Sequence, residues 1–440
     1  MSQLDFKVTA GGVLKGSLRV PGDKSISHRS IMFGALADGT SHVTGFLQGE
    51  DSLNTLRAFR AMGVTIEGPS SDGNVVIHGV GINGLKQPDK ALDVGNSGTS
   101  MRLMSGLLAG QSFDVVLSGD RSLSKRPMKR VTDPLALMGA NVETEDNGRP
   151  PLKIKGGSLL KGIHYDMPMA SAQVKSCLLL AGMYAQGQTC VTEPAPTRDH
   201  TERMLTAFGY PVIRNGDTIC IQGGGRLTAC DIDVPADISS AAFFIVAASI
   251  AKGSDLTLLH VGINPTRTGI IDIMKLMGAD IELLNMREVG GEPVADIRIR
   301  SRQLKGAEIP ESLVPLAIDE FPVIFVAAAC AEGKTIISGA EELRVKESDR
   351  IQVMADGLQA LGVDAQPTED GMIIQGGLIQ GGKVHARDDH RIAMAFTMAA
   401  LRSQGDIHIE DCVNVNTSFP DFVALANSVG LKVTAEEANF

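Results

Sequence analysis

The sequence predicts an α/β protein of two or more domains, assembled from six copies of one helix-and-strand unit. Its 440 residues are too many for one ordinary hydrophobic core. Two patterns alternate along the chain, and each occurs six times at intervals of about 70 residues. One pattern is an amphipathic segment that ends at a glycine before a short β-branched strand. The other is a helical segment that is apolar nearly all round and also leads into a strand.

The amphipathic segments are expected to form surface helices. Apolar residues recur at helical spacing up to the glycine, which can adopt the positive φ that ends a helix. Each copy therefore contributes one helix that covers a more apolar one. The six glycines are Gly63, Gly139, Gly209, Gly278, Gly362 and Gly430.

The apolar segments are expected to form buried helices whose first turns are polar. A helix N-terminus carries free N–H groups and the positive end of the dipole, so converging N-termini favour an anion. Ser, Asn and Asp are also ordinary N-caps, and for any single helix capping is the simpler explanation. Six polar starts on buried helices nevertheless favour an anion site. The segments begin near Lys24, Asn96, Ser171, Asp237, Asp319 and Asp389.

Composition excludes several classes of function. With 41 basic and 51 acidic residues the net charge is −10, which argues against a general nucleic-acid binder. No His or Cys spacing typical of a metal site occurs, so neither a metal nor a cofactor is expected. The longest apolar stretch, 241–251, is too short for a membrane span, and residues 1–9 do not resemble a signal peptide. We expect the six cysteines to be buried free thiols of a cytoplasmic protein.

Cations gather at the helix starts of the N-terminal half. Val20-PGDKSISHR places Lys24 and Arg29 within a turn and a half of a helix start, which is unfavourable unless an anion neutralises them. His28, in the same segment, is interpreted as an ordinary helix-surface residue. Asp93-VGNSGTSMR adds small residues that let a ligand approach the backbone closely.

The C-terminal half adds carboxylates beside further cations. The run Leu343-RVKESDR is most often a solvated helix face, and pairing along a helix explains part of it. Asp319 and Glu320 lie just ahead of an apolar helix, where low-dielectric surroundings and nearby cations tune a carboxyl for proton transfer. The residues thus predict an acid–base site for a small, multiply charged anion.

Together these segments resemble the 5-enolpyruvylshikimate-3-phosphate synthase family over nearly the whole chain. The stretches Ser171-AQVK and Thr197-RDHTERML resemble the second class of this glyphosate-target family, which includes tolerant members. Gly98, in contrast, leaves room beside phosphoenolpyruvate as in sensitive members. The matching motifs are Pro21-GDKSISHR, Gly95-NSGTSMR, Lys125-RPM, Ser171-AQ, Arg344-VKESDR, Asp389-HRIAM and Ser418-FPDF.

The resemblance implies a two-domain inside-out α/β barrel of the EPT/RTPC-like type, with six βαβαββ repeats, three per domain, closing on substrate like a clamshell. Residues 1–20 plus 235–440 would form the domain that holds phosphoenolpyruvate and the acid–base groups. Residues 21–234 would form the shikimate 3-phosphate side. The N-terminal strand would belong to the domain formed mainly by the C-terminal half.

The implied reaction transfers the enolpyruvyl group of phosphoenolpyruvate to the 5-hydroxyl of shikimate 3-phosphate by addition and elimination, releasing phosphate. It belongs to chorismate and aromatic amino acid biosynthesis. The resemblance implies a cytoplasmic monomer that binds these two small molecules, uses no cofactor, and binds neither nucleic acid nor membrane.

The resemblance also implies roles for single residues. Asp319 would be the base for the hydroxyl, Glu347 the proton donor, and Lys24 would contact both substrates. Arg126, Arg350 and Arg391 would hold phosphoenolpyruvate. The residues expected to bind substrate are Ser25, Arg29, Asn96, Gly98, Thr99, Arg126, Ser171, Ala172, Gln173, Arg198, Lys346, Arg350, His390 and Arg391.

One departure from the family pattern concerns a cation. Many members carry a lysine before the Phe-Pro-Asp stretch, where this chain reads Thr417-Ser418. That cation is therefore missing or is supplied elsewhere, by Lys175 or Arg387.

Two alternative functions remain at this point. UDP-N-acetylglucosamine enolpyruvyl transferase shares the implied fold but carries a loop cysteine near the Arg126 position, and residues 119–127 contain none. A non-catalytic anion-binding repeat protein is the other alternative. Such a protein would have no reason to keep Asp319 and Glu347 together with three arginines.

Overall fold

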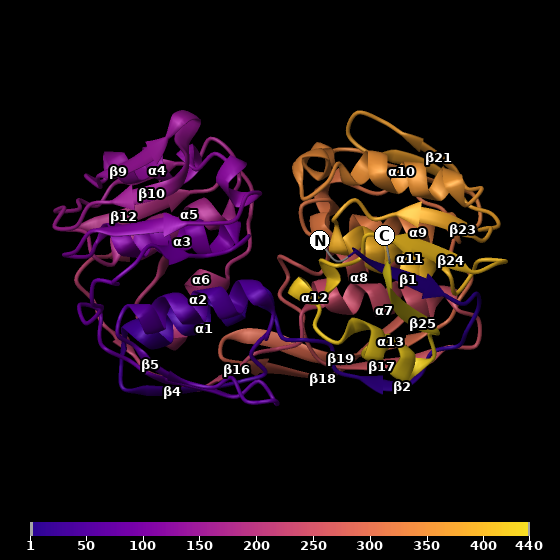
Figure 1. The fold of residues 1–440 in the computed structure, drawn as a ribbon, viewed down its shortest axis with the longest axis horizontal. Coiled ribbons are helices and arrows are strands. Elements are labelled where there is room, and N and C mark those ends of the chain that lie inside the picture. The colour runs from indigo at the N-terminus through magenta and orange to yellow at the C-terminus, as the bar shows by residue number, and fades with distance from the viewer. Residues whose placement is uncertain (1–2, 439–440) are drawn as a thin grey trace. The chain divides into compact units, whose positions relative to one another are not determined.

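The computed structural model describes residues 3–438, which divide into two compact units (Figure 1). The first unit consists of Met1–Pro21, Pro235–Glu288 and Pro293–Phe440, and the second of Gly22–Val234 and Val289–Glu292. From the sequence, residues 289–292 were expected in the domain that contains both chain ends. In the structure they form the tip of a hairpin that packs with the second unit.

The second unit repeats one four-stranded sheet three times. Its strands are β3 (Ala37–Asp38), β4 (Thr40–Thr44), β5 (Thr65–Glu67), β6 (Val75–His78), β7 (Leu92–Asp93), β8 (Val115–Ser118), β9 (Val142–Glu145), β10 (Arg149–Ile154), β11 (His164–Asp166), β12 (Gln188–Thr192), β13 (Ile213–Asn215), β14 (Thr218–Gln222), β15 (Leu227–Thr228) and β16 (Ile232–Asp233). The sheet orders are β16-β4-β6-β5, β7-β8-β10-β9 and β11-β12-β14-β13. In each sheet the first two strands are parallel and the remaining neighbours are antiparallel.

Three buried helices and three surface helices accompany these sheets. The buried ones are α1 (Lys24–Leu36), α3 (Gly98–Ala109) and α5 (Ala172–Gly182), and the surface ones are α2 (Glu50–Ala61), α4 (Lys129–Leu137) and α6 (His200–Ala207). Each buried helix starts at a side chain that accepts a backbone N–H bond. Asp23 caps α1, Ser97 caps α3 and Ser171 caps α5.

The first unit contains three further sheets. Its strands are β1 (Gln3–Val8), β2 (Lys15–Leu18), β17 (Asp255–Gly262), β18 (Asp280–Val289), β19 (Glu292–Arg300), β20 (Lys334–Ile337), β21 (Asp364–Pro367), β22 (Met372–Gln375), β23 (Gly382–His385), β24 (Ile407–Glu410) and β25 (Val433–Ala438). The orders are β18-β19-β17-β2, β20-β22-β21 and β23-β24-β1-β25. The N-terminal strand β1 therefore lies between two C-terminal strands (Figure 1), as the resemblance implied.

The helices of the first unit follow the same division. Buried helices are α7 (Ile238–Ile250), α9 (Phe321–Ala329) and α11 (His390–Ala399), and covering helices are α8 (Gly269–Leu276), α10 (Arg350–Ala360), α12 (Val415–Ser418) and α13 (Phe422–Val429). Short 3-10 turns lie at Leu123–Lys125, Asp146–Gly148, Glu311–Leu313, Ile318–Glu320 and Glu341–Val345. Across residues 3–438 this gives six repeats, each with one buried helix and one surface helix, and the last repeat has the short helix α12 in addition. None of the helices described is both long enough and apolar enough to cross a membrane.

The glycines that end the surface helices have the backbone conformation that the sequence predicted. All six have φ between 78° and 127°, in the region that L side chains rarely adopt. Because each sits at or just after the last helical residue, it turns the chain out of the helix. The prediction is confirmed for Gly63, Gly139, Gly209, Gly278, Gly362 and Gly430.

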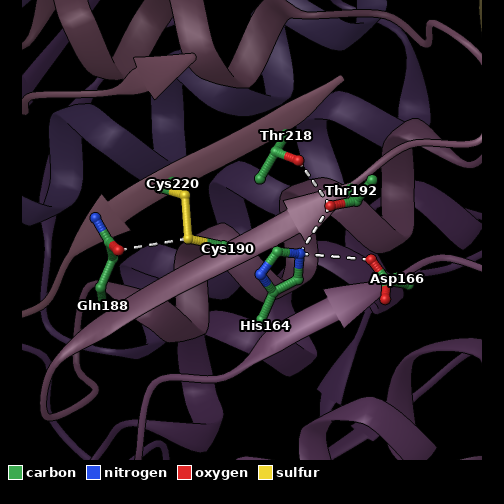
Figure 2. The surroundings of a disulfide bond; sticks show 7 residues. All are labelled: His164, Asp166, Gln188, Cys190, Thr192, Thr218 and Cys220. Atoms are coloured by element: carbon green, nitrogen blue, oxygen red, sulfur yellow. Dashed lines mark hydrogen bonds and ion pairs between the residues drawn. A yellow bond between two sulfur atoms is a disulfide. The ribbon is translucent and has the colours of Figure 1, made fainter. Parts of the chain in front are cut away.

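The expectation of six free thiols is wrong for one pair. Cys190 on β12 and Cys220 on β14 are directly opposite in the antiparallel ladder and form a disulfide (Figure 2). Their Cα atoms are 4.1 Å apart because neighbouring strands place them there, although they are 30 residues apart in sequence. Figure 2 shows the bond beside the hydroxyl pair of Thr192 and Thr218, 2.8 Å apart. Cys177, Cys230, Cys330 and Cys412 are free thiols.

Candidate functional site

The predicted site residues fall into two groups, one in each unit. The second unit holds Lys24, Ser25, Arg29, Asn96, Gly98, Thr99, Arg126, Ser171, Ala172, Gln173 and Arg198. The first unit holds Asp319, Lys346, Glu347, Arg350, His390 and Arg391. The residues predicted to bind anions are thus divided between the units, and both carboxylates predicted for acid–base roles belong to the first.

In the second unit, side chains from the first two turns of the three buried helices contact one another. Gln173 at the start of α5 donates to Thr99 Oγ1 on α3 at 2.9 Å. Arg102 on α3 donates to Gln173 Oε1 at 2.6 Å. Arg29 on α1 donates to Ser176 Oγ on α5 at 3.1 Å. The positive ends of three helices are thereby brought to one place, together with two guanidinium groups.

Lys24, the first residue of α1, forms an ion pair with Asp51 in the first turn of α2. Its side chain is 36% exposed, and that of Asp51 is 17% exposed. The sequence argument required an anion to neutralise the cations at this helix start, and for Lys24 a carboxylate of the chain does so. Sequence reasoning missed Asp51. The available signal was the position of Asp51 in the first turn of an amphipathic helix, where an acidic side chain is favoured.

Arg29 is 4% exposed, so it is held by the protein rather than by solvent. It donates to Thr201 Oγ1 at 2.8 Å and to the Ser25 carbonyl at 2.9 Å. Burial lowers its pKa to about 10, which leaves it charged at neutral pH. Ser25, Ala172 and Arg198 are partly exposed, and Ser171 Oγ accepts the cap bond of α5 from Val174 N at 3.2 Å.

The loop before α3 is lined by guanidinium groups. Arg126 donates to Asn96 Oδ1 at 3.1 Å, and the Asn96 amide donates to Asp120 at 2.8 Å. A Cβ on Gly98 would lie 3.0 Å from Arg102 Nη1 and 3.5 Å from Arg126 Nη1. Burial, followed by the charge of Arg126, lowers the pKa of Arg102 to about 10. A side chain on Gly98 would therefore crowd two cations, and Arg102, which belongs to the motif Asp93-VGNSGTSMR, lies beside the predicted site residues.

The interpretation of His28 as a helix-surface residue is wrong. It is completely buried, because α1 is covered on every side. Its Nδ1 lies 2.8 Å from Thr55 Oγ1, and its Nε2 has no hydrogen-bond partner. Burial and the nearby charge of Lys24 lower its pKa to about 3. The imidazole is therefore neutral at physiological pH.

Lys175 cannot replace the lysine that is absent before Ser418. It is fully buried, with Nζ 2.7 Å from Glu193 and 3.0 Å from Glu202. Arg387 is exposed. Its neighbour Asp388 accepts a hydrogen bond from Asn414 at 2.8 Å, which brings Arg387 close to the segment that leads to Ser418.

In the first unit, Arg350 at the start of α10 lies among three carboxylates. Its Nη2 is 2.7 Å from Glu347 Oε2, its Nε is 2.9 Å from Asp389 Oδ2, and its Nη1 is 3.7 Å from Asp319 Oδ1. It is 1% exposed. For this residue the alternative of a solvated helix face is wrong. Asp389 is also the N-cap of α11, so the same carboxylate caps the start of one helix and orients the arginine of another.

Three more predicted residues surround Asp319. Arg391 on α11 donates to the Asp319 carbonyl at 3.3 Å. Lys346 Nζ is 3.8 Å from Asp319 Oδ1 and 2.9 Å from Glu342 Oε1. Burial and the adjacent Arg391 lower the pKa of His390 to about 4, so this imidazole is also neutral.

The surroundings shift the pKa values of two carboxyl groups near this cluster in opposite directions. Loss of hydration raises the pKa of Glu347, but the charge of Arg350 and further contributions, among them the charge of Arg391, together outweigh it and hold that pKa at about 2. Burial, with the charge of Asp319, raises the pKa of Glu320, which accepts a hydrogen bond from Ser239. Carboxyls whose environments separate their pKa values are typical of acid–base sites.

Chemically, the two groups offer guanidinium and ammonium donors beside carboxylates. Guanidinium forks suit carboxylate and phosphate oxygens, and the carboxylates can move protons. Within residues 3–438 the structure contains no group of three His, Cys, Asp or Glu side chains that could hold a metal ion.

The chain is similar to known proteins over nearly its whole length. A family model described as EPSP synthase (3-phosphoshikimate 1-carboxyvinyltransferase) matches residues 8–425. Relatives named 3-phosphoshikimate 1-carboxyvinyltransferase from Methylococcus capsulatus and Hydrogenovibrio crunogenus are each 67% identical. These alignments cover 97% and 99% of this chain and 98% and 99% of the two relatives.

Solved structures extend the comparison to the fold. The EPSP synthase of Acinetobacter baumannii is 60% identical, with a TM-score of 0.93 over 99% of this chain and 100% of that one. The enolpyruvyl transferase NikO from Streptomyces tendae has a TM-score of 0.80 over all of both chains at 16% identity, a likeness of fold.

Proposed function

The chain belongs to the EPSP synthase family, and from this premise we propose that it transfers the enolpyruvyl group of phosphoenolpyruvate to the 5-hydroxyl of shikimate 3-phosphate. Phosphate is released, and the product enters chorismate and aromatic amino acid biosynthesis. The observation that carries the proposal at the level of the site is the cluster around Arg350. It combines one buried guanidinium with the carboxylates of Asp319 and Glu347, the acid–base pair that the reaction requires.

Phosphoenolpyruvate is held by Arg126 of the second unit and by Arg350 and Arg391 of the first. Its carboxylate and phosphate match the paired N–H donors of guanidinium groups. The loop 96–99 lies beside it, since Asn96 already accepts from Arg126. Arg387 supplies the cation that the family pattern places before the Ser418 segment.

Shikimate 3-phosphate is positioned by the other predicted residues. Its phosphate and hydroxyls meet the N-terminus of α5 and the start of α1, where free N–H groups and the helix dipoles favour an anion. His390 stays neutral and acts as a hydrogen-bonding group. The residues assigned to this substrate are Ser25, Arg29, Ser171, Ala172, Gln173, Arg198 and Lys346.

Addition begins with protonation of the methylene carbon of phosphoenolpyruvate. Glu347 is the donor, yet beside Arg350 it holds no proton at neutral pH. An anionic substrate that takes the Nη2 donor of Arg350 compensates part of the positive charge that keeps Glu347 ionised and adds negative charge beside it. The pKa of Glu347 then rises, and binding of phosphoenolpyruvate itself prepares the acid.

Asp319 accepts the proton of the 5-hydroxyl as the oxygen attacks the cationic carbon. Lys346 and Arg350 lie within 3.8 Å of its carboxylate and orient it. In the elimination, the Glu347 carboxylate takes back a proton from the new methyl group while phosphate leaves from the adjacent carbon, which restores the double bond. Lys24, paired with Asp51 in this structure, contacts both substrates.

We further propose that the protein works as a cytoplasmic monomer. The Cys190–Cys220 disulfide is unusual for a reducing compartment. A thiol count on protein isolated under non-reducing conditions therefore tests this part of the proposal. Four reactive thiols after denaturation would match the disulfide of the structure, and six would show that the pair is reduced in the cell, as a reducing compartment predicts.

Phosphate release from the two substrates tests the function. We expect release that requires both phosphoenolpyruvate and shikimate 3-phosphate. UDP-N-acetylglucosamine in place of shikimate 3-phosphate should give none. Asp319→Asn should lose turnover while shikimate 3-phosphate still shifts the melting temperature. Release with the sugar nucleotide, or full turnover in Asp319→Asn, would overturn the proposal.

A further inference from the structure

A chain of buried hydrogen bonds crosses the second unit from α1 to α3. His28 Nδ1 lies 2.8 Å from Thr55 Oγ1 on α2, and Thr55 Oγ1 lies 2.7 Å from Ser100 Oγ on α3. Ser100 Oγ lies 2.7 Å from Ser97 Oγ, the N-cap of α3. All four side chains are at most 2% exposed. Three helices are thus joined through polar groups that water does not reach.

The donor and the acceptor of each hydrogen bond in this chain follow from the bonds that Ser97, the N-cap of α3, accepts. Ser97 Oγ already accepts from the Ser100 N–H at 3.0 Å, and the Ser100 hydroxyl donates to the same oxygen. Because the Ser100 hydrogen is used in this way, Ser100 accepts from Thr55, and Thr55 accepts from His28 Nδ1, which also lies 3.3 Å from Ser100 Oγ. This fixes the proton of His28 on Nδ1 and leaves Nε2 with a bare lone pair, the atom without a partner.

A buried nitrogen without a partner costs free energy, so His28 requires an explanation beyond packing. One end of the chain lies a single helical turn from Lys24, and the other end is the cap that precedes Gly98 and Thr99. Asp51 and Thr55 are also one turn apart on α2. Asp51 contacts Lys24, and Thr55 contacts His28. The Lys24–Asp51 ion pair and the His28–Thr55 hydrogen bond therefore both connect α1 to α2, and the second of these contacts continues to α3.

We propose that His28 is a positioning residue for phosphoenolpyruvate. Through Thr55 and Ser100 it holds the first turn of α3, and with it the loop 96–99, at a fixed place relative to Lys24. The role requires a neutral ring, because a charge one turn from Lys24 would repel the cation that the substrates need. This inference rests on the proposed function, since it names a substrate of that reaction.

Two matched pairs of variants test the proposal. In His28→Asn the amide nitrogen replaces the Nδ1–H donor, whereas in His28→Gln the longer side chain places its amide near Nε2. Thr55→Ser keeps the hydroxyl of the chain, and Thr55→Val removes it at constant shape. We expect His28→Asn and Thr55→Ser to stay within about threefold of the wild type. We expect His28→Gln and Thr55→Val to raise KM for phosphoenolpyruvate about tenfold or more, with KM for shikimate 3-phosphate changed less than threefold.

A purely structural role would give a different result. It would lower the melting temperature and leave the ratio of the two KM values unchanged, and that outcome would overturn the proposal. Nitrogen NMR of the histidine side chains in the wild type, assigned by comparison with His28→Asn, supplies a readout that needs no turnover. We expect a neutral ring protonated at Nδ1, and a proton on Nε2 would also overturn it. A wild type that released no phosphate would refute the proposed function, and the NMR result would still decide the hydrogen-bond chain.

Discussion

At the scale of single residues, buried charges decide how the site works. Arg350 is removed from water and lies among Glu347, Asp389 and Asp319. A buried cation of this kind is tolerable only when it is paired, and removing a partner leaves an uncompensated charge. Glu347 is thus at once the partner of Arg350 and the proposed acid.

Glu347→Gln separates these two roles. The amide cannot donate a proton to carbon, so kcat should fall by about 10² to 10⁴. KM for phosphoenolpyruvate should stay the same or fall, because Arg350 no longer has to break its ion pair with Glu347 before it binds the substrate. Steady-state phosphate release measures both constants. Glu342→Gln, at an exposed carboxylate that pairs with Lys346, is the control and should retain most of the activity. A raised KM with normal kcat would show that Glu347 is not the acid.

His28 makes a prediction about stability in acid. Its pKa falls from 6.5 to about 3 on folding, so between these values the unfolded chain binds a proton that the folded chain does not. This contribution to stability is complete above pH 6.5 and is lost as the pH falls towards 3. The loss approaches about 1.4 kcal/mol per pH unit.

Urea unfolding of the wild type and of His28→Asn at pH 7, 6, 5 and 4 measures this loss. The variant lacks the titrating ring, so its free energy of unfolding should decline less steeply in this window. Parallel curves for the two proteins would contradict the assignment of a neutral buried imidazole.

At the scale of the elements, capping and function are not alternatives. Ser171, Asp237 and Asp389 each accept a backbone N–H bond at the start of a buried helix. Capping, the simpler explanation of a polar helix start, is thus correct for these helices. Yet Asp389 also binds Arg350, and Asp237 binds Arg267 at 2.8 Å. Asp237 and Asp389 thus both cap the start of a helix and orient a cation.

The glycines after the surface helices should resist substitution because of their backbone conformation. Gly278 has φ of 92°, and a Cβ at this position would have no neighbour closer than 4.0 Å, so Gly278→Ala tests the dihedral angle alone. It should lower the free energy of unfolding by about 1 to 2 kcal/mol. Gly377→Ala is the matched control, with open space and an ordinary φ, and should stay within about 0.5 kcal/mol. Equal effects in urea unfolding would contradict the argument.

At the scale of the whole molecule, each unit contains three repeats and the chain passes between the units more than once. β1 belongs to the first unit, and so does everything after Pro235 except the hairpin tip 289–292. Within the second unit, that tip is anchored by a hydrogen bond between Glu292 Oε1 and His200 Nδ1 at 2.7 Å. The proposed function assigns residues of both units to one substrate.

Substrate binding should therefore draw the two units together. Cations of like charge repel across an open site until an anion bridges them. We expect the radius of gyration from small-angle scattering to fall when shikimate 3-phosphate is added. Lys24→Met should show a smaller change. An identical radius with and without ligand would contradict closure.

Several features of this protein follow from the sequence by itself. The six repeats, the glycines that end the surface helices and the polar starts of the buried helices were all predicted. These features depend on residues three or four apart, or on the φ of one glycine, so a local pattern encodes them. The motif resemblance also identified the family and the overall fold.

Only the tertiary structure decided which charged and polar groups meet. It paired Lys24 with Asp51, joined Cys190 to Cys220, and enclosed Lys175 between Glu193 and Glu202. It also showed that His28, which the sequence predicted to lie on a helix surface, is buried. The partners in these pairs are 18 to 30 residues apart, on separate helices and strands. Their distances depend on how those elements pack, and no periodicity along the chain records that.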